Sequence, residues 1–154
     1  MSIRVQDIMA REVVTIDSSQ SAKNAARLMT KFGISALVVL TEGNLVGILT
    51  EKDILTRVVA SGQDSDNVKV EEIMTEPVII VNPEMPLEEA ARIMLQEKVK
   101  KLPVVTKEEG GMRLVGMLSL TDIARLHPQL WEGIKKLAQA NTDIVETDAK
   151  FYIR

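Results

Sequence analysis

Two short stretches of the chain carry residue types from which a small-molecule site could be built. In each stretch a glycine is followed by two apolar residues, then a hydroxyl residue and, three positions later, an aspartate. Thr50 and Asp53 end the first stretch, and Ser119 and Asp122 end the second. A hydroxyl residue caps a helix by accepting from a free backbone amide, and an acidic residue suits the first helical turn. The same amides attract anions, and a fixed carboxylate can hold two sugar hydroxyls, so the pattern suits both a capped helix and a nucleotide site.

Other kinds of chemistry find little support in the residues. The sequence has no cysteine, which excludes thiolate nucleophiles, and its single histidine, His127, cannot by itself form a metal site or a catalytic triad. It also lacks a nucleophile beside a base and a GxxxxGK phosphate loop. We therefore expect no enzyme, no catalytic or metal site and no required cofactor.

Composition and charge narrow the class of protein further. Apolar residues make up 45% of the 154 residues and charged residues 27%, as in an ordinary globular protein. The net charge of -3 disfavours nucleic acid as a partner, because binding to a phosphate backbone usually needs a basic face. Since no apolar run approaches the roughly 20 residues that span a bilayer, we expect a cytoplasmic protein with no membrane partner.

An internal repeat organises the chain. Residues 7–9 match residues 72–74, and the same spacing of 65 positions carries residues 13–16 onto 78–81 and 25–29 onto 90–94. After Thr41 and Thr106 the second copy has four extra residues, so the spacing between the two motifs is 69. The extra residues fall within 107–113, where glycines and charges predict a hairpin turn. An insertion at a turn is what two copies of one fold should show.

Each copy predicts the same order of elements: strand, helix, strand, strand, helix. The apolar patterns place first strands at 13–16 and 78–81, hairpins at 37–49 and 102–118, and closing helices at 53–60 and 121–126. Pro103 has no amide, so its strand should begin there or have a free edge. We expect an α+β fold with repeat 1 at residues 1–62, repeat 2 at 63–127 and a linker at about 62–69. In the remaining region, 128–154, a helix is predicted over 129–141, and 144–154 have strand character without a clear period.

Two tandem units of this order, each with the doubled motif, resemble the cystathionine-β-synthase (CBS) domain pair, or Bateman module. Residues 7–9, 72–75 and 102–105 fit that family as well, and the resemblance covers about residues 3–127 in what looks like a stand-alone module. It implies two repeats related by a pseudo-twofold axis. It also implies a regulatory role, in which AMP, ADP, ATP or S-adenosylmethionine binds in the cleft between the repeats and the bound state is passed to an effector protein.

The resemblance also implies roles for individual residues. In such families the aspartate holds the ribose and the hydroxyl residue lies near the phosphates, which pairs Asp53 with Thr50 and Asp122 with Ser119. Members of such families also place a pair of basic residues before the second strand of one repeat, where the pair binds the phosphates at the site marked by the aspartate of the other repeat. Here that pair is Lys100 and Lys101, while the first copy has uncharged residues at the equivalent places, so we expect the Asp53 site to suit a charged nucleotide better. The base would lie near the first strand of each repeat, at Thr15, Ile16 and Asp17 and at Ile80, Val81 and Asn82.

Simpler interpretations remain open. Both motifs fit capping boxes that serve helix stability alone, and the two lysines could do no more than favour a helix end. The CBS pair could also be a scaffold or regulatory subunit that binds protein and no ligand. The apolar residues at positions 54, 55, 58 and 59 exceed what one core contact uses, which predicts a homodimer through the repeat helices.

Overall fold

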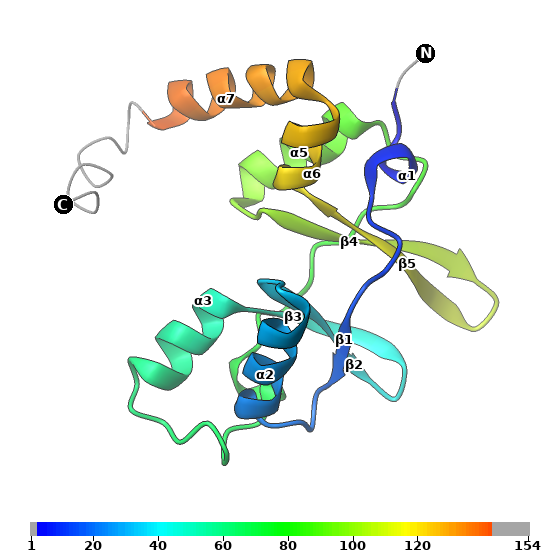
Figure 1. Cartoon of the computed structure of the whole chain (residues 1–154). Coiled ribbons are helices and arrows are strands. Elements are labelled where there is room, and N and C mark those ends of the chain that lie inside the picture. Colours follow the sequence, from blue (N-terminus) through cyan, green and yellow to red (C-terminus); the bar gives the residue numbers. More distant parts are fainter. Residues whose placement is uncertain (1–2, 143–154) are drawn as a thin grey trace.

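Two lobes, each a small sheet with helices, lie one above the other in the structure, a computed structural model that describes residues 3–142 (Figure 1). The predicted α+β class is confirmed. In chain order the elements are α1 Val5–Ile8, β1 Thr15–Asp17, α2 Ala22–Phe32, β2 Ala36–Thr41, β3 Asn44–Thr50, α3 Glu51–Ile54, the π-helical segment η1 Leu55–Val59, α4 Val70–Ile73, α5 Leu87–Glu97, β4 Lys101–Glu108, β5 Gly111–Ser119, α6 Leu120–Leu126 and α7 Pro128–Thr142. The strand character of residues 144–154 falls outside the described residues.

The sheets repeat one design. In the first lobe β1 pairs parallel with β2, and β2 pairs antiparallel with β3. In the second lobe β4 and β5 form the matching hairpin, with a register shift at the same place, after Val104 where the first hairpin has it after Val39. The four extra residues lengthen the second hairpin, so that its ladder runs out to the pair Glu108 and Gly111.

The strand predicted over residues 78–81 is reduced to one parallel bridge, between Val81 and Val104. Its equivalent in the first lobe is the full strand β1, where the amide of Val38 donates to the carbonyl of Val14 at 3.3 Å. Pro103 takes the place of Val38 in the second copy and has no amide to donate. Loss of this bond leaves the second lobe with a two-stranded sheet.

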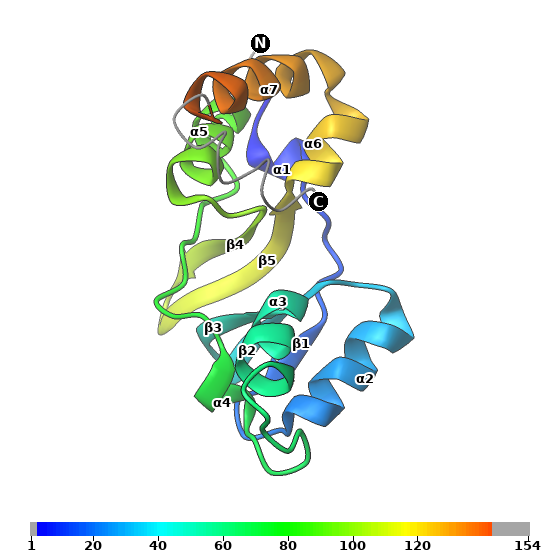
Figure 2. The same ribbon diagram turned by 90° about the vertical axis from the view of Figure 1, so that its left-hand side faces the viewer.

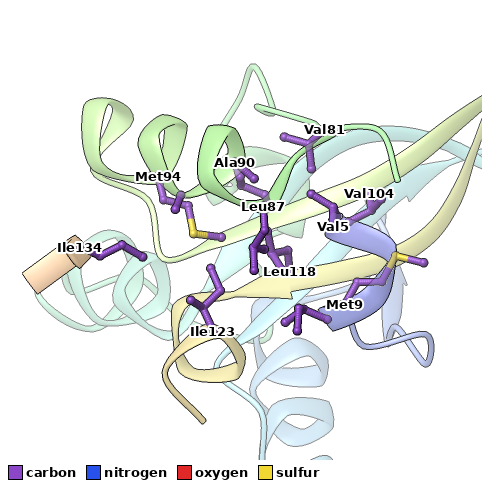
Figure 3. Packing of buried hydrophobic residues seen from close by; sticks show 13 residues of the cluster. Val5, Met9, Val81, Leu87, Ala90, Met94, Val104, Leu118, Ile123 and Ile134 are labelled. Atoms are coloured by element: carbon purple, nitrogen blue, oxygen red, sulfur yellow. The ribbon is translucent and has the colours of Figure 1, made fainter. Parts of the chain in front are cut away.

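The two repeats exchange their opening segments. α1 lies in the lobe of the second repeat, where the amide of Val5 donates to the carbonyl of Met85 at 2.9 Å. α4 lies in the lobe of the first repeat, where the amide of Val70 donates to the carbonyl of Gln20 at 2.8 Å (Figure 2). Val5 is therefore part of the second lobe's hydrophobic core, as Figure 3 shows, and Val70 is part of the first lobe's core. Each lobe needs the other repeat to complete its interior.

α7 covers α5 and α6 of the second lobe. Its Ile134 is 4% exposed and packs into the core of that lobe (Figure 3). On the first lobe, η1 leaves large apolar side chains in solvent, with Leu55 60% exposed and Val59 65% exposed. Across residues 3–142, none of the helices combines the length and apolar character needed to cross a membrane.

Candidate functional site

The first motif forms the predicted capping box at the junction of β3 and α3. The amide of Asp53 donates to Oγ1 of Thr50 at 3.2 Å, and the amide of Thr50 donates to Oδ2 of Asp53 at 2.9 Å. Each residue thus satisfies a backbone donor that the helix start would otherwise leave unpaired. The capping interpretation of Thr50 and Asp53 is confirmed, and a ligand role for them would come in addition to it.

The carboxylate of Asp53 has further partners inside the protein. The hydroxyl of Thr75 donates to it at 3.1 Å from Oδ1 and 3.3 Å from Oδ2. Nε of Arg57 lies 4.0 Å from Oδ1, and the same guanidinium donates through Nη1 to the carbonyls of Ile73 and Met74, both at 3.0 Å. Asp53 is only 7% exposed. The first motif therefore binds the exchanged segment that begins the second repeat.

The second motif is capped more simply. The amide of Asp122 donates to Oγ of Ser119 at 3.0 Å, which fixes the start of α6. The Asp122 carboxylate forms an ion pair with Nη2 of Arg125 at 3.0 Å, and the side chains of Asp122 and Arg125 are 20% and 70% exposed. An exposed pair of this kind contributes little to stability. The Asp122 carboxylate is thus more accessible than that of Asp53.

A cavity of about 690 Å³ lies between the lobes beside Asp122. Its volume falls in the range that holds small-molecule ligands in other proteins. One wall comes from α2 and the start of α3, and the other from the start of β4 and the junction of β5 with α6. Its lining residues are Ala26, Met29, Thr30, Gly33, Ile34, Ser35, Glu51, Ile54, Lys101, Ser119, Thr121 and Asp122. Both repeats therefore contribute to one cavity. Its apolar side chains all come from the first lobe, together with the carboxylate of Glu51, and the wall from the second lobe is polar.

The charges in the cavity come from Lys101, Glu51 and Asp122. Lys101 reaches this place because it is paired with Ser119 in the β4–β5 ladder. The cavity therefore brings Lys101 together with Asp122, whereas the sequence assigned the lysines to the Asp53 site. Lys100 is exposed and is not among the lining residues.

The first amide of each motif helix is already bonded within the protein. The amide of Glu51 donates to the carbonyl of Ser35, and the amide of Leu120 donates to that of Lys100, both at 3.0 Å. The third amide bonds the capping hydroxyl in both motifs, so two of the first three amides of each motif helix already have partners within the protein.

The residues predicted near the base lie mainly elsewhere. Thr15, Ile16 and Asp17 form β1, and Asn82 occupies the place equivalent to Asp17 in the second copy. Both side chains close local turns, because Oδ1 of Asp17 accepts from the amide of Ser19 at 2.9 Å and Oδ1 of Asn82 accepts from the amide of Glu84 at 3.0 Å. The Ser19 hydroxyl, followed by its amide, lowers the pKa of Asp17.

Ile80 lines a second cavity, of about 410 Å³, which lies against β3. The other lining residues of this cavity are Leu45, Val46, Glu76, Pro77, Val78 and Met112. Of the residues that the sequence assigned to binding, those that line neither cavity are Thr15, Ile16, Asp17, Thr50, Asp53, Val81, Asn82 and Lys100.

Sequence reasoning missed several contributors to the larger cavity. Glu51 and Thr121 stand inside the two motifs at positions to which the pattern assigns no residue type. Ala26 and Met29 belong to α2, and Met29 is also part of the first lobe's core, so the sequence carries no separate signal for their place in the cavity.

Comparison with known proteins agrees with this architecture. CBS domain-containing protein YhcV of Bacillus subtilis (strain 168) is 36% identical over 120 residues, covering 78% of this chain and 82% of that protein. The hexameric CBS-CP12 protein from bloom-forming cyanobacteria has a similar structure, with a TM-score of 0.71 and 36% identity over 80% of this chain and 67% of that one. The CBS domain pair of protein MJ0100, in complex with 5′-methylthioadenosine and S-adenosyl-L-methionine, has a TM-score of 0.73 and 31% identity over 84% of this chain and 98% of that one.

The family model of the CBS domain matches the chain twice, over residues 5–60 and 70–128. The two matches coincide with the internal repeat and include both motifs. They also confirm the expectation that the chain is a regulatory module and not an enzyme. The chain therefore belongs to the CBS domain family.

Proposed function

We propose that this chain is a regulatory module that binds an adenosine-containing ligand in the cavity of about 690 Å³ between its lobes. The observation that carries the proposal is that Asp122, Ser119 and Lys101 line one cavity together with apolar side chains of the other repeat. A nucleoside has an apolar, flat base and a polar sugar, and this cavity offers apolar side chains from the first repeat and polar ones from the second.

The proposed roles follow from the chemistry of each wall. Asp122 accepts hydrogen bonds from the two ribose hydroxyls, because its carboxylate faces the cavity and has one exposed partner. Lys101 and Thr121 bind the anionic group attached to the ribose. The base packs against Met29, Ile34 and Ile54. The adenosine compounds bound by the CBS pair of protein MJ0100, which is 31% identical, support this class of ligand.

Transmission of the signal requires a ligand that favours one arrangement of the lobes over another. A molecule in this cavity touches α2 of the first lobe and α6 of the second, so its affinity depends on their separation. Leu55 and Val59 lie in η1, which follows α3 directly, and these two exposed side chains provide the proposed homodimer contact. A change in lobe placement would alter that contact and so the dimer that a partner protein recognises.

Thermal unfolding with AMP, ADP, ATP and S-adenosylmethionine tests the proposal. A ligand present at a hundredfold excess over its dissociation constant should add about 2.7 kcal/mol to the free energy of unfolding. Asp122→Ala should abolish the shift, while the matched change Glu109→Ala, in the exposed turn of the second hairpin, should leave it unchanged. A flat response of the unsubstituted protein to all four compounds would contradict the proposal and favour the scaffold alternative.

A further inference from the structure

The two motif aspartates have unequal surroundings in this chain. We infer that the chain binds one adenosine ligand and not two, because Asp53 is committed to a clasp with Thr75 and Arg57. The clasp is defined as these three residues together with the carbonyls of Ile73 and Met74 to which Arg57 donates. The number of ligands rests on the proposed function, whereas the clasp itself stands on the contacts alone.

The clasp uses both oxygens of the Asp53 carboxylate. Oδ2 accepts from the Thr50 amide at 2.9 Å, and the Thr75 hydroxyl lies within hydrogen-bond distance of both oxygens. Hydrogen bonds to an ionised carboxylate are stronger than neutral ones, and Asp53 is nearly buried. A ribose that bound here would have to displace Thr75 and leave the capped amide of Thr50 without its partner. Such a displacement carries the desolvation cost of the groups left unpaired.

The second repeat has no counterpart of the clasp among the described residues. The residue equivalent to Thr75, 65 positions earlier, is Ala10, which has no hydroxyl. The residue equivalent to Arg57, 69 positions later, is Leu126, which has no guanidinium and is 52% exposed. Asp122 is left with Arg125, an exposed partner that a ligand can displace at little cost.

The position of each aspartate agrees with this division of roles. Asp122 lines the cavity of about 690 Å³, and Asp53 is not among its lining residues. Asp53 instead holds Thr75, which is paired with Ile48 of β3 through two backbone hydrogen bonds of 2.8 and 3.1 Å. The first motif thus fastens the exchanged segment of the second repeat, and the second motif is left for the ligand.

An exchange of residues between the halves tests the inference. Titration calorimetry with AMP and with S-adenosylmethionine should give one site per chain for the unsubstituted protein. The double variant Thr75→Ala with Arg57→Leu copies the second half into the first, and it should add a second site per chain. The matched variant Thr75→Ser with Arg57→Lys keeps a hydroxyl and a cation and should keep one site. Two equivalent sites in the unsubstituted protein, or one site in the double variant, would overturn the inference.

Thermal unfolding without ligand tests the clasp separately. Asp53→Ala should lower the unfolding midpoint by about 5 °C or more, since it removes several partly buried hydrogen bonds. Asp122→Ala should lower it by less than half as much. Equal shifts for the two variants would contradict the clasp. If neither compound binds the unsubstituted protein, the proposed function fails, and this comparison still decides whether the clasp exists.

Discussion

A Cβ added to Gly116 would lie 2.6 Å from Sδ of Met9 and 2.8 Å from the carbonyl oxygen of Ala10. The glycine that begins the second motif is therefore the place where the opening segment of the first repeat crosses β5. Ala10 and Met117 exchange two backbone hydrogen bonds at this crossing, both of 2.9 Å. In the other lobe Met74 and Thr75 pack closely against Gly47 in the same way.

Gly116→Ala should destabilise the protein by about 1–3 kcal/mol, the usual cost of overpacking a tight contact. Gly47→Ala should cost less, because the side chain of Met74 can move and the backbone contact there, 3.2 Å from the carbonyl of Thr75, is longer. Chemical denaturation measures both changes. Gly133→Ala is the control, since its Cβ would meet nothing within 4 Å and it lies inside α7. It should stabilise the protein by about 0.5–1 kcal/mol, and an equal loss for all three variants would contradict the crossing as the cause.

Ile134→Ala should cost about 2–5 kcal/mol, because it leaves a hole in the core of the second lobe. Leu137 lies on the same helix but is 57% exposed, so Leu137→Ala should change the free energy of unfolding by less than about 0.5 kcal/mol. Urea denaturation of the two variants makes the comparison. Similar losses of unfolding free energy in the two variants would show that α7 is not part of the folded core.

Asp17 should titrate below the ordinary value of 3.8, because the Ser19 hydroxyl and amide both favour its charged form. A pKa lowered by folding adds stability that is present above the unfolded pKa and is lost as the pH falls through the folded pKa. Ser19→Ala should move the pKa of Asp17 back toward 3.8. Carboxyl chemical shifts measured by NMR against pH test both statements, and an unshifted Asp17 in the unsubstituted protein would contradict them.

Much of the fold is visible in the sequence because the signals are local. The hairpins, α2 and α5 follow from apolar periods and turn residues, and the doubled motif predicts a capped helix in each copy. The exchange of α1 and α4 could not be predicted in this way. Each of these helices has four residues, too few for a period, and a repeated pattern does not say in which lobe a segment lies.

The clasp shows the same limit at the level of single residues. Thr75 and Asp53 are 22 positions apart, and they meet because α4 has crossed into the first lobe.

The position of Lys101, by contrast, could have been predicted from the sequence. The ends of the hairpin predicted over residues 102–118 are paired, Leu102 with Leu118, and one further step along the two strands puts Lys101 opposite Ser119. Strand register therefore places this lysine beside the second motif.

The charge balance of the cavity predicts which ligands it prefers. One ammonium, of Lys101, lines the cavity with two carboxylates. Of these, Asp122 is paired with Arg125, whereas Glu51 remains as a negative charge in the cavity. A ligand with one phosphate can pair with the ammonium, whereas further phosphates add charge beside Glu51. We expect AMP to bind more tightly than ATP, which titration calorimetry with the two compounds measures directly.

Glu51→Gln isolates this electrostatic term. Removing a carboxylate from the cavity that binds the phosphate should strengthen the binding of AMP by about 1 kcal/mol, or roughly fivefold. Adenosine has no phosphate, so its affinity should stay the same, and Lys101→Ala should weaken AMP while leaving adenosine unchanged. Glu109→Gln makes the same charge change in the exposed hairpin turn and serves as the control. If Glu51→Gln changes AMP and adenosine equally, the residue acts through the shape of the cavity, and the argument from charge fails.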